Sequence, residues 1–359
     1  MISCSVLTSE KDVDDLADAW RALQARVGKV PFTDYDWAMT WWRVIGKPSG
    51  ALLKVVVCYD KGQLVGILPL TVRCNHRFCI LHLLGHDVYY YRSFLIDNPR
   101  YVEALWHTAL TQIDYDFANI KNIHDETPER AFFEKNTICL QRASIYYRPL
   151  TEKSRDEVIA HYPKSFRRKI KKVQQIIQAD PTLSLRVTQG DEDTARVIDF
   201  LVRRKQAWVK QNCKRGFFLG KNTLTFYQEM AQLAAAQGRL LLHWIEEEGV
   251  PIAADLAFTY GGVVYSHTLA YAPAKSRLLP GYSLNMAGLL WGVENGQSEF
   301  NLMEGEEDYK TYFTRETRGV NEYVHARTLA GRVYLWLYWL LRGFRALSER
   351  LRCLRPPKS

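Results

Sequence analysis

Four side chains between positions 255 and 306 are suited to proton transfer: Asp255, His267, Glu304 and Glu306. Asp255 lies within the apolar stretch AADLA, where an unpaired carboxylate would be costly. It is therefore either a structural acid or one that is poised to hold a proton. His267 has an intrinsic pKa suited to proton transfer near neutral pH, although a lone histidine in a strand is more often structural. Glu304 and Glu306 follow a short apolar segment at an acidic turn, where they are either catalytic or simply solvated.

The elements that must position these groups follow from the pattern around them. Two β-rich runs, Ile252–Tyr260 and Val263–Tyr271, are separated by a glycine pair, which predicts a hairpin. A polar loop leads to a predicted helix over Tyr282–Glu294, and Gly296 is placed to end it. A short strand over Glu299–Met303 then precedes the acidic turn. The predicted order is strand, strand, loop, helix, strand.

This order, with Pro280-Gly281 ahead of the helix and the closing segment Gly305–Lys310 (GEEDYK), resembles the GNAT superfamily of N-acyltransferases. It is most similar to the FemAB-like branch, which includes the acetyltransferase domain of CelD-type cellulose-biosynthesis proteins. The resemblance covers Pro163–Phe313 well and the preceding part more loosely, as a degenerate first half. It implies an α/β fold of two tandem GNAT-like (FemAB-like) mixed-sheet domains with a C-terminal basic amphipathic helix. The expected units are residues 1–150 on the acceptor side, 151–330 as the acyltransferase domain, and 331–359 as the tail.

The resemblance implies attack of an amine on an acyl-thioester carbonyl, with the enzyme positioning both partners and stabilising the oxyanion. Two strands, Val263–Tyr271 and Glu299–Met303, are expected to splay and admit the acyl-pantetheine. The expected oxyanion donor is a backbone N–H among Thr268, Leu269 and Ala270. The coenzyme pyrophosphate is expected on the loop and the first helical turn. The residues concerned are Arg277, Gly281, Tyr282 and Ser283.

The loop itself departs from the usual GNAT pattern. Pro280 stands at the position of the first glycine and Tyr282 at that of the last, and proline removes one N–H donor. This departure leaves the donor open. Acyl-CoA is the leading co-substrate, with no permanently bound cofactor, and acyl carrier protein and aminoacyl-tRNA are alternative donors.

The resemblance also implies roles for side chains. The four acid or imidazole groups are the candidate bases for the amine, and Lys310 resembles the lysine of the family's Y-K signature, which lies beside the reacting carbonyl. Tyr309 or Tyr312 is a candidate for protonating the leaving thiolate. The candidate substrate-side residues are Tyr89, Tyr91, Arg92, Arg168 and Trp208. For these, an aromatic surface loop and a solvated basic helix face (Ser165–Gln178) are the alternative interpretations.

Bulk properties add limits. The net charge is +9 with a pI near 9.1, which favours an anionic partner such as coenzyme phosphates, a nucleic acid or a membrane surface; we expect no DNA partner. The seven cysteines are scattered and odd in number, as expected of reduced thiols in a cytosolic protein. Cys74, His76, Cys79 and His82 have no spacing typical of a closed metal site, so no metal is expected. The N-terminus lacks the pattern of a signal peptide.

The tail contains nine consecutive apolar residues, Val333–Leu341, and a membrane-spanning helix needs about 20. Beyond them, apolar side chains continue at helical spacing, and the segment from 331 to 359 carries seven basic residues and one acidic residue. This pattern predicts a basic amphipathic helix at the inner face of the cytoplasmic membrane. The alternative is a helix docked on its own domain.

The resulting hypothesis is an N-acyltransferase that modifies an amine on a sugar, lipid or peptide precursor of a bacterial envelope or exopolysaccharide. Two alternatives stay open. One is an aminoacyl-tRNA-dependent transferase of the FemAB type. The other is a catalytically inactive GNAT-like scaffold for a polysaccharide-synthesis machine.

Overall fold

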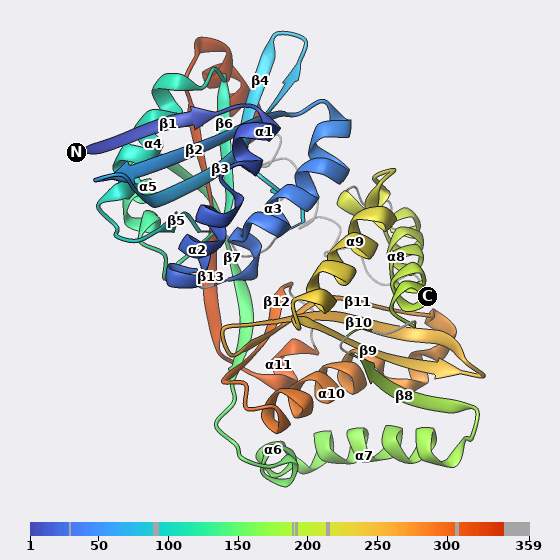
Figure 1. The fold of residues 1–359 in the computed structure, drawn as a ribbon. Helices are drawn as coiled ribbons and strands as arrows, with labels where there is room; N and C mark the ends of the chain where they lie inside the picture. Colours follow the sequence, from blue (N-terminus) through green and yellow to red (C-terminus); the bar gives the residue numbers. More distant parts are fainter. Residues whose placement is uncertain are drawn as a thin grey trace.

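The computed structural model describes residues 1–28, 30–88, 93–188, 190, 193–212, 216–305 and 309–340. Its strands form a single 13-stranded mixed sheet that runs through both halves of the chain (Figure 1). Helices cover both faces of this sheet in the C-terminal half. The α/β class and the mixed sheets expected from the sequence are therefore present.

The N-terminal half contributes strands β1 (Ile2–Leu7), β2 (Leu52–Asp60), β3 (Gln63–Asn75), β4 (Phe78–Leu83), β5 (Leu95–Ile96) and β6 (Phe117–His124). Its helices are α1 (Glu10–Asp14), α2 (Ala17–Val27), α3 (Tyr35–Trp41), α4 (Tyr101–Gln112) and α5 (Glu129–Asn136). Helix α3 begins at Tyr35 because the Asp34 carboxylate accepts a hydrogen bond from the Asp36 backbone N–H and caps the helix. A π-helical turn, Trp42–Gly46, follows it directly.

The C-terminal half contributes strands β8 (Leu183–Thr188), β9 (Leu240–Glu247), β10 (Val250–Tyr260), β11 (Val263–Tyr271) and β12 (Glu299–Glu304). Its helices are α6 (Arg155–His161), α7 (Lys164–Ala179), α8 (Asp193–Gln211), α9 (Thr223–Ala236), α10 (Pro280–Glu294) and the short α11 (Lys310–Phe313). Helix α7 is amphipathic as expected, because Phe166, Ile170 and Val173 are buried while its basic side chains are exposed.

Two long strands join the halves: β7 (Ile138–Pro149) and β13 (Thr317–Ala326). The strand order is β1-β2-β3-β4-β6-β13-β7-β12-β11-β10-β9-β8, with β5 paired to β3. The chain therefore returns after the second half, and β13 lies between β6 and β7 in the sheet of the first half (Figure 1).

The halves also share a hydrophobic core on one face of the sheet. Trp37 from α3 packs edge-on against Phe258 of β10 at 4.6 Å between ring centroids, and Phe32 packs against Tyr265 of β11. Helices α8 and α9 belong to the same core. An ion pair between Arg239 and Asp34, at 3.1 Å, lies beside it. The relative position of the two halves is therefore set by packing as well as by strand pairing.

The opposite face of the C-terminal sheet is covered by α7 and α10. Phe166 and Ile170 of α7 meet Leu289 of α10, Leu241 of β9 and Phe300 of β12 in a separate core. Helices α8 and α7 consequently lie on opposite faces of the same sheet, which matters for the residues that they carry.

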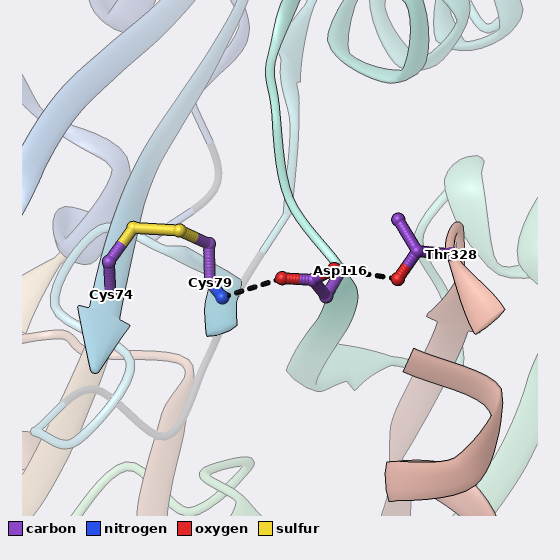
Figure 2. The surroundings of a disulfide bond; sticks show 4 residues. All are labelled: Cys74, Cys79, Asp116 and Thr328. Carbon is purple, nitrogen blue, oxygen red and sulfur yellow. Dashed lines mark hydrogen bonds between the residues drawn. A yellow bond between two sulfur atoms is a disulfide. The ribbon is translucent and has the colours of Figure 1, made fainter. Parts of the chain in front are cut away.

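Cys74 and Cys79 form a disulfide (Figure 2), so the expectation that all seven cysteines are reduced is wrong for this pair. The physical reason is the β3–β4 hairpin, whose register places the two residues directly opposite each other with Cα atoms 4.1 Å apart. The pairing also removes two of the four side chains considered for a metal. Cys4, Cys58 and Cys139 form no disulfide within the described part of the chain.

Asp116 links this hairpin to the start of a further helix at 329–340 (Figure 2). Its carboxylate accepts hydrogen bonds from the Cys79 backbone N–H at 2.8 Å and from the Thr328 hydroxyl at 2.6 Å. A Cβ atom at Gly331 would lie 1.9 Å from the Asp116 carbonyl oxygen, so only glycine fits at this approach. Most of the basic tail expected from the sequence, at 341–359, lies outside the described residues.

Candidate active site

The two strands expected to splay do so. Strands β11 and β12 pair in parallel only from Val263–Glu299 to Tyr265–Asn301. Beyond that point β11 continues beside β10 to Tyr271, while β12 continues beside β7. The opening lies between Thr268–Tyr271 on one strand and the end of β12 on the other, where an acyl-pantetheine would be received in the family that the sequence resembles.

A β-bulge at His267 explains why β11 turns away. Leu256 pairs with Thr268 and Ala257 with Ser266, so His267 is an extra residue in β11. A bulge bends its strand and increases the local twist, and bulges are common next to active sites. The candidate oxyanion residues Thr268, Leu269 and Ala270 follow the bulge directly and therefore line the diverging part of β11.

The end of β12 is irregular in a complementary way. Met303 has a φ of 58°, in the left-handed region that a non-glycine residue rarely adopts, and its N–H is bound by the Asn301 side chain at 2.9 Å. Such outliers cluster at functional sites because the surrounding structure must hold them in place. Sequence reasoning missed Asn301, whose polarity within an apolar strand was the available signal.

Lys310 lies beside this bend and is only 3% exposed. Its Nζ donates hydrogen bonds to the backbone oxygens of Glu304 at 2.8 Å and Met303 at 3.4 Å. A buried ammonium group is thus held at the end of β12, at the opening between the two strands. Glu304 is the half-buried last residue of β12, whereas Glu306 lies outside the described residues.

Asp255 is fully buried, and it lies on the α10 face of the sheet, because its partner Ser266 also contacts Asn285 of α10. Burial raises the pKa of its carboxyl to about 7. The Ser266 hydroxyl lies 3.0 Å from each Asp255 oxygen and 3.3 Å from Asn285 Oδ1, and Asn285 donates to the Gly281 carbonyl at 2.6 Å. The acid therefore acts on the first turn of α10 through a chain of hydrogen bonds. We assign it a positioning role.

His267 faces the other side of the sheet, where the N-terminal half covers it. Its ring packs near Phe32 and Phe258, and its Nε2 lies 3.4 Å from the Tyr227 hydroxyl. Burial lowers the pKa of the imidazole to about 3. The side chain is consequently neutral at physiological pH and a much weaker base than its intrinsic pKa suggests.

The candidate pyrophosphate loop is partly covered by side chains, so few of its groups are free to bind a phosphate. Leu279 precedes α10 with a φ of 44°, and the Tyr309 ring lies over Gly281, 3.4 Å from where a Cβ would stand. The Ser283 hydroxyl donates to the Leu278 carbonyl at 2.7 Å, so it is turned into the loop. Arg277 is exposed at the loop surface.

A cation that the sequence reasoning did not single out lies near this loop. Lys169 of α7 has its Nζ 5.7 Å from the ring centre of Tyr282 and 5.0 Å from that of Tyr312. The neighbouring Arg168 is exposed. Adjacent residues of a helix are about 100° apart, so Lys169 flanks the buried face of α7, whereas Arg168 lies opposite that face. This helical spacing was an available signal for Lys169.

Two of the substrate-side candidates, Arg168 and Trp208, do not lie together. Arg168 is on α7 and Trp208, which is 47% exposed, is on α8, and these helices cover opposite faces of the sheet. Tyr89, Tyr91 and Arg92 lie outside the described residues. Just before them, Asp87 accepts a hydrogen bond from the indole N–H of Trp41 at 2.9 Å.

Comparison with known proteins agrees with this geometry. Residues 164–311 match the family model described as "Acetyltransferase (GNAT) domain". No curated protein sequence matches the chain.

Solved structures resemble the chain over most of its length. A crystal structure of FemX aligns with a TM-score of 0.60 at 10% identity, covering 92% of this chain and 99% of FemX. The C-terminal domain of a putative lysylphosphatidylglycerol synthetase from Agrobacterium fabrum gives 0.55 at 11% identity, covering 90% and 96%. A tandem GNAT protein from the clavulanic acid biosynthesis pathway gives 0.52 at 12% identity, covering 91% and 99%. With the splayed strands and the matched domain, these similarities show that the chain has the fold of FemX and of tandem GNAT proteins.

Proposed function

We propose that this protein transfers an acyl group from a thioester, bound between β11 and β12, to an amine that approaches between the two halves. In this proposal residues 1–150 form the acceptor side and 151–330 the acyltransferase unit. The observation that carries it is the early end of the β11–β12 ladder, next to a buried lysine. Open backbone groups on diverging strands suit an extended pantetheine chain, and a fixed positive charge suits a developing oxyanion.

In the proposed reaction, each residue at the opening has its own role. The amine nitrogen forms a bond to the thioester carbon as the carbon–sulfur bond breaks. Glu304 takes the proton of the amine, and Tyr309 returns one to the departing thiolate. Lys310, with a backbone N–H from Thr268–Ala270, stabilises the charge on the carbonyl oxygen. His267 contributes to the wall of the site rather than to proton transfer, because its imidazole is a weak base.

Acyl-CoA is the donor that we favour. The cations Lys169 and Arg277 lie near the candidate pyrophosphate loop and are available to its phosphates. Aminoacyl-tRNA is the second candidate, and a specific observation favours it: Tyr309 covers Gly281 and Ser283 is turned away, so the pyrophosphate loop offers few donors.

For the acceptor, we propose an amine on a sugar, lipid or peptide precursor of the bacterial envelope or an exopolysaccharide, as the likeness to CelD-type proteins implies. We also propose that the protein works at the inner face of the cytoplasmic membrane. Within the described part of the chain, no helix combines the length and apolarity needed to cross a bilayer. Support for surface binding comes from the helix at 329–340, whose exposed apolar side chains recur at helical spacing. They are Leu329, Val333, Trp336, Leu337 and Leu340.

The test is thiol release from acetyl-CoA and longer acyl-CoAs with amino sugars as acceptors, together with thermal unfolding. A donor at 100 times its dissociation constant should stabilise the protein by about 2.7 kcal/mol, which raises the unfolding temperature by a few degrees. Release that depends on the acceptor supports the proposal. Transfer from aminoacyl-tRNA alone would favour the second candidate, and no transfer from any donor would contradict an enzymatic role.

A further inference from the structure

A second cavity lies on the far side of α11 from the end of β12. Its volume is about 680 Å³, within the range typical of small-molecule sites. The end of β7, the α6–α7 connection and α11 form its walls. Lys310 faces β12, whereas Tyr312 and Phe313 of the same helix line this cavity. The cavity is therefore distinct from the opening between the splayed strands.

Two buried polar side chains line this cavity without being fully satisfied. Arg148 and Tyr162 are each 4% exposed, and the guanidinium carbon lies 5.0 Å from the centre of the Tyr162 ring. Arg148 forms an ion pair with Glu152 through Nη2. Its Nη1 and the Tyr162 hydroxyl have no hydrogen-bond partner among the described residues and are shielded from solvent. Burial raises the pKa of Tyr162 to about 12, so the hydroxyl remains a donor.

Helix α7 begins at the same place. Pro163 is its N-cap and lines the cavity, no side chain caps the helix, and its first turn contains no acidic residue. The N-terminus of this 16-residue helix therefore keeps its partial positive charge uncompensated. Unpaired backbone donors at a helix N-terminus, next to an arginine and a tyrosine hydroxyl, are the groups that bind phosphate in proteins.

The remaining lining residues fit an anionic ligand with an organic part. Arg315 and His161 are exposed at the rim. Glu152 is neutralised by Arg148, which leaves Glu316 as the other carboxylate. Tyr312 is 46% exposed and offers an aromatic face, with the Lys169 ammonium 5.0 Å from its ring centre. Aromatic faces of this kind stack on planar bases.

We propose that this cavity binds a phosphate ester, with the phosphate at the N-terminus of α7 between Arg148 and Tyr162 and the organic group against Tyr312. Because both donors are shielded from solvent, binding requires the Arg148 and Tyr162 side chains to move toward the ligand. The ligand is either the nucleotide end of the acyl donor or a phosphorylated acceptor, and the choice of probe distinguishes them. The assignment of the ligand as donor or acceptor rests on the proposed function, whereas the phosphate-ester site itself is tested by direct binding, which can succeed when acyl transfer fails.

The experiment is isothermal titration calorimetry of the full chain with three probes: inorganic pyrophosphate, adenosine 3′,5′-bisphosphate and UDP-N-acetylglucosamine. Binding of the second identifies the donor as the source, and binding of the third identifies the acceptor. Tyr162→Phe should weaken the bound probe about tenfold or more, since one hydrogen bond to a charged group is lost. The same change should leave the unfolding temperature equal or higher, because it removes a buried hydroxyl that has no partner in the empty protein.

Tyr323→Phe is the matched control. Tyr323 is also fully buried, and its hydroxyl also lacks a partner among the described residues, but it lies in the core of the N-terminal half. It should give the same effect on unfolding and none on binding. Arg148→Lys, which keeps the charge but loses the guanidinium fork, should also weaken binding. The proposal is overturned if no probe binds the native chain, or if Tyr162→Phe and Arg148→Lys both bind as the native chain does.

Discussion

The Ser266 hydroxyl lies 3.0 Å from both carboxyl oxygens of Asp255, deep in the sheet. Ser266 has a single hydroxyl hydrogen, yet the two Asp255 oxygens and Asn285 Oδ1 are three acceptors around it. A protonated Asp255 supplies the missing hydrogen. This count agrees with the raised pKa, about 7, that burial gives the carboxyl. The proton on Asp255 therefore belongs to the network that holds the first turn of α10.

Asp255→Asn tests this directly through stability. A carboxyl with a pKa of about 3.9 in the unfolded chain and about 7 in the folded chain holds its proton more tightly when folded. Its contribution is present below about pH 4 and is lost as the pH rises to about 7, by up to about 4 kcal/mol. The asparagine variant cannot titrate. Its free energy of unfolding relative to that of the native protein should therefore rise across this window and keep the higher value above it. Urea unfolding of both proteins at pH 4.5 and pH 8 gives the comparison. An equal difference at the two pH values would contradict a buried, protonated Asp255.

The pH dependence of stability that His243 causes should have the opposite sign to that of Asp255. It is buried on β9, both ring nitrogens lack a hydrogen-bond partner among the described residues, and burial lowers its pKa to about 3. The unfolded chain therefore binds the proton more tightly below pH 6.5, and the native protein loses stability as the pH falls towards 3. His243→Leu should remove this loss, gaining roughly 1.4 kcal/mol per pH unit below 6.5. A free-energy difference that is constant from pH 4 to pH 7.5 would show that His243 does not titrate in this way.

Features set by local sequence signals were predictable, whereas features set by pairing between distant residues were not. Hairpin, loop, helix and splayed strands in the C-terminal half were predictable, because a glycine pair, a Pro-Gly and apolar runs are local signals. The Asp255 position was also informative, since an acid within an apolar strand has few roles. The insertion of β13 between β6 and β7 was not predictable, because strand order depends on pairing between residues almost 200 positions apart.

The same limit applies to side chains. Helical spacing places Lys169 at the edge of the buried face of α7 and Arg168 opposite it, but the contacts of Lys169 with Tyr282 and Tyr312 are known only from the fold. The Cys74–Cys79 bond was missed because cysteine spacing was considered without the hairpin register that pairs the two residues. His267 was given its intrinsic pKa, whereas the aromatic rings from both halves that bury it are known only from the fold.

Lys310 is the residue whose removal should affect chemistry most. Lys310→Met should lower kcat/KM by about 10²–10³, the loss typical of removing one group that stabilises an oxyanion. Because Nζ also bonds two β12 carbonyls, thermal unfolding of the variant must accompany the kinetics. Lys310→Arg keeps the charge and should recover part of the rate. Thiol release at the native rate by Lys310→Met would remove the lysine from the mechanism.

Glu304→Gln should lower kcat and flatten the rise of kcat with pH, since the general base is gone.

The helix at 329–340 is the expected contact with the membrane. Tyr334 packs on Phe78 and Phe117 at about 5 Å between ring centroids, and Asp116 holds the start of the helix through Thr328. The helix is therefore fixed on the N-terminal half, with Trp336 and Trp339 exposed on it. An indole that enters a membrane interface contributes roughly 1–2 kcal/mol, so each Trp→Ser change here should weaken binding about tenfold.

Co-sedimentation with anionic and with neutral vesicles measures this binding. The native chain should bind the anionic vesicles more tightly, and added salt should weaken it, because the basic residues of the tail contribute through charge. Trp208→Ser is the control, since Trp208 is another exposed indole, on α8 in the other half of the molecule. If Trp336→Ser and Trp208→Ser weaken binding equally, the helix at 329–340 is not the membrane contact. If the native chain does not bind anionic vesicles, the protein reaches its acceptor without binding the membrane.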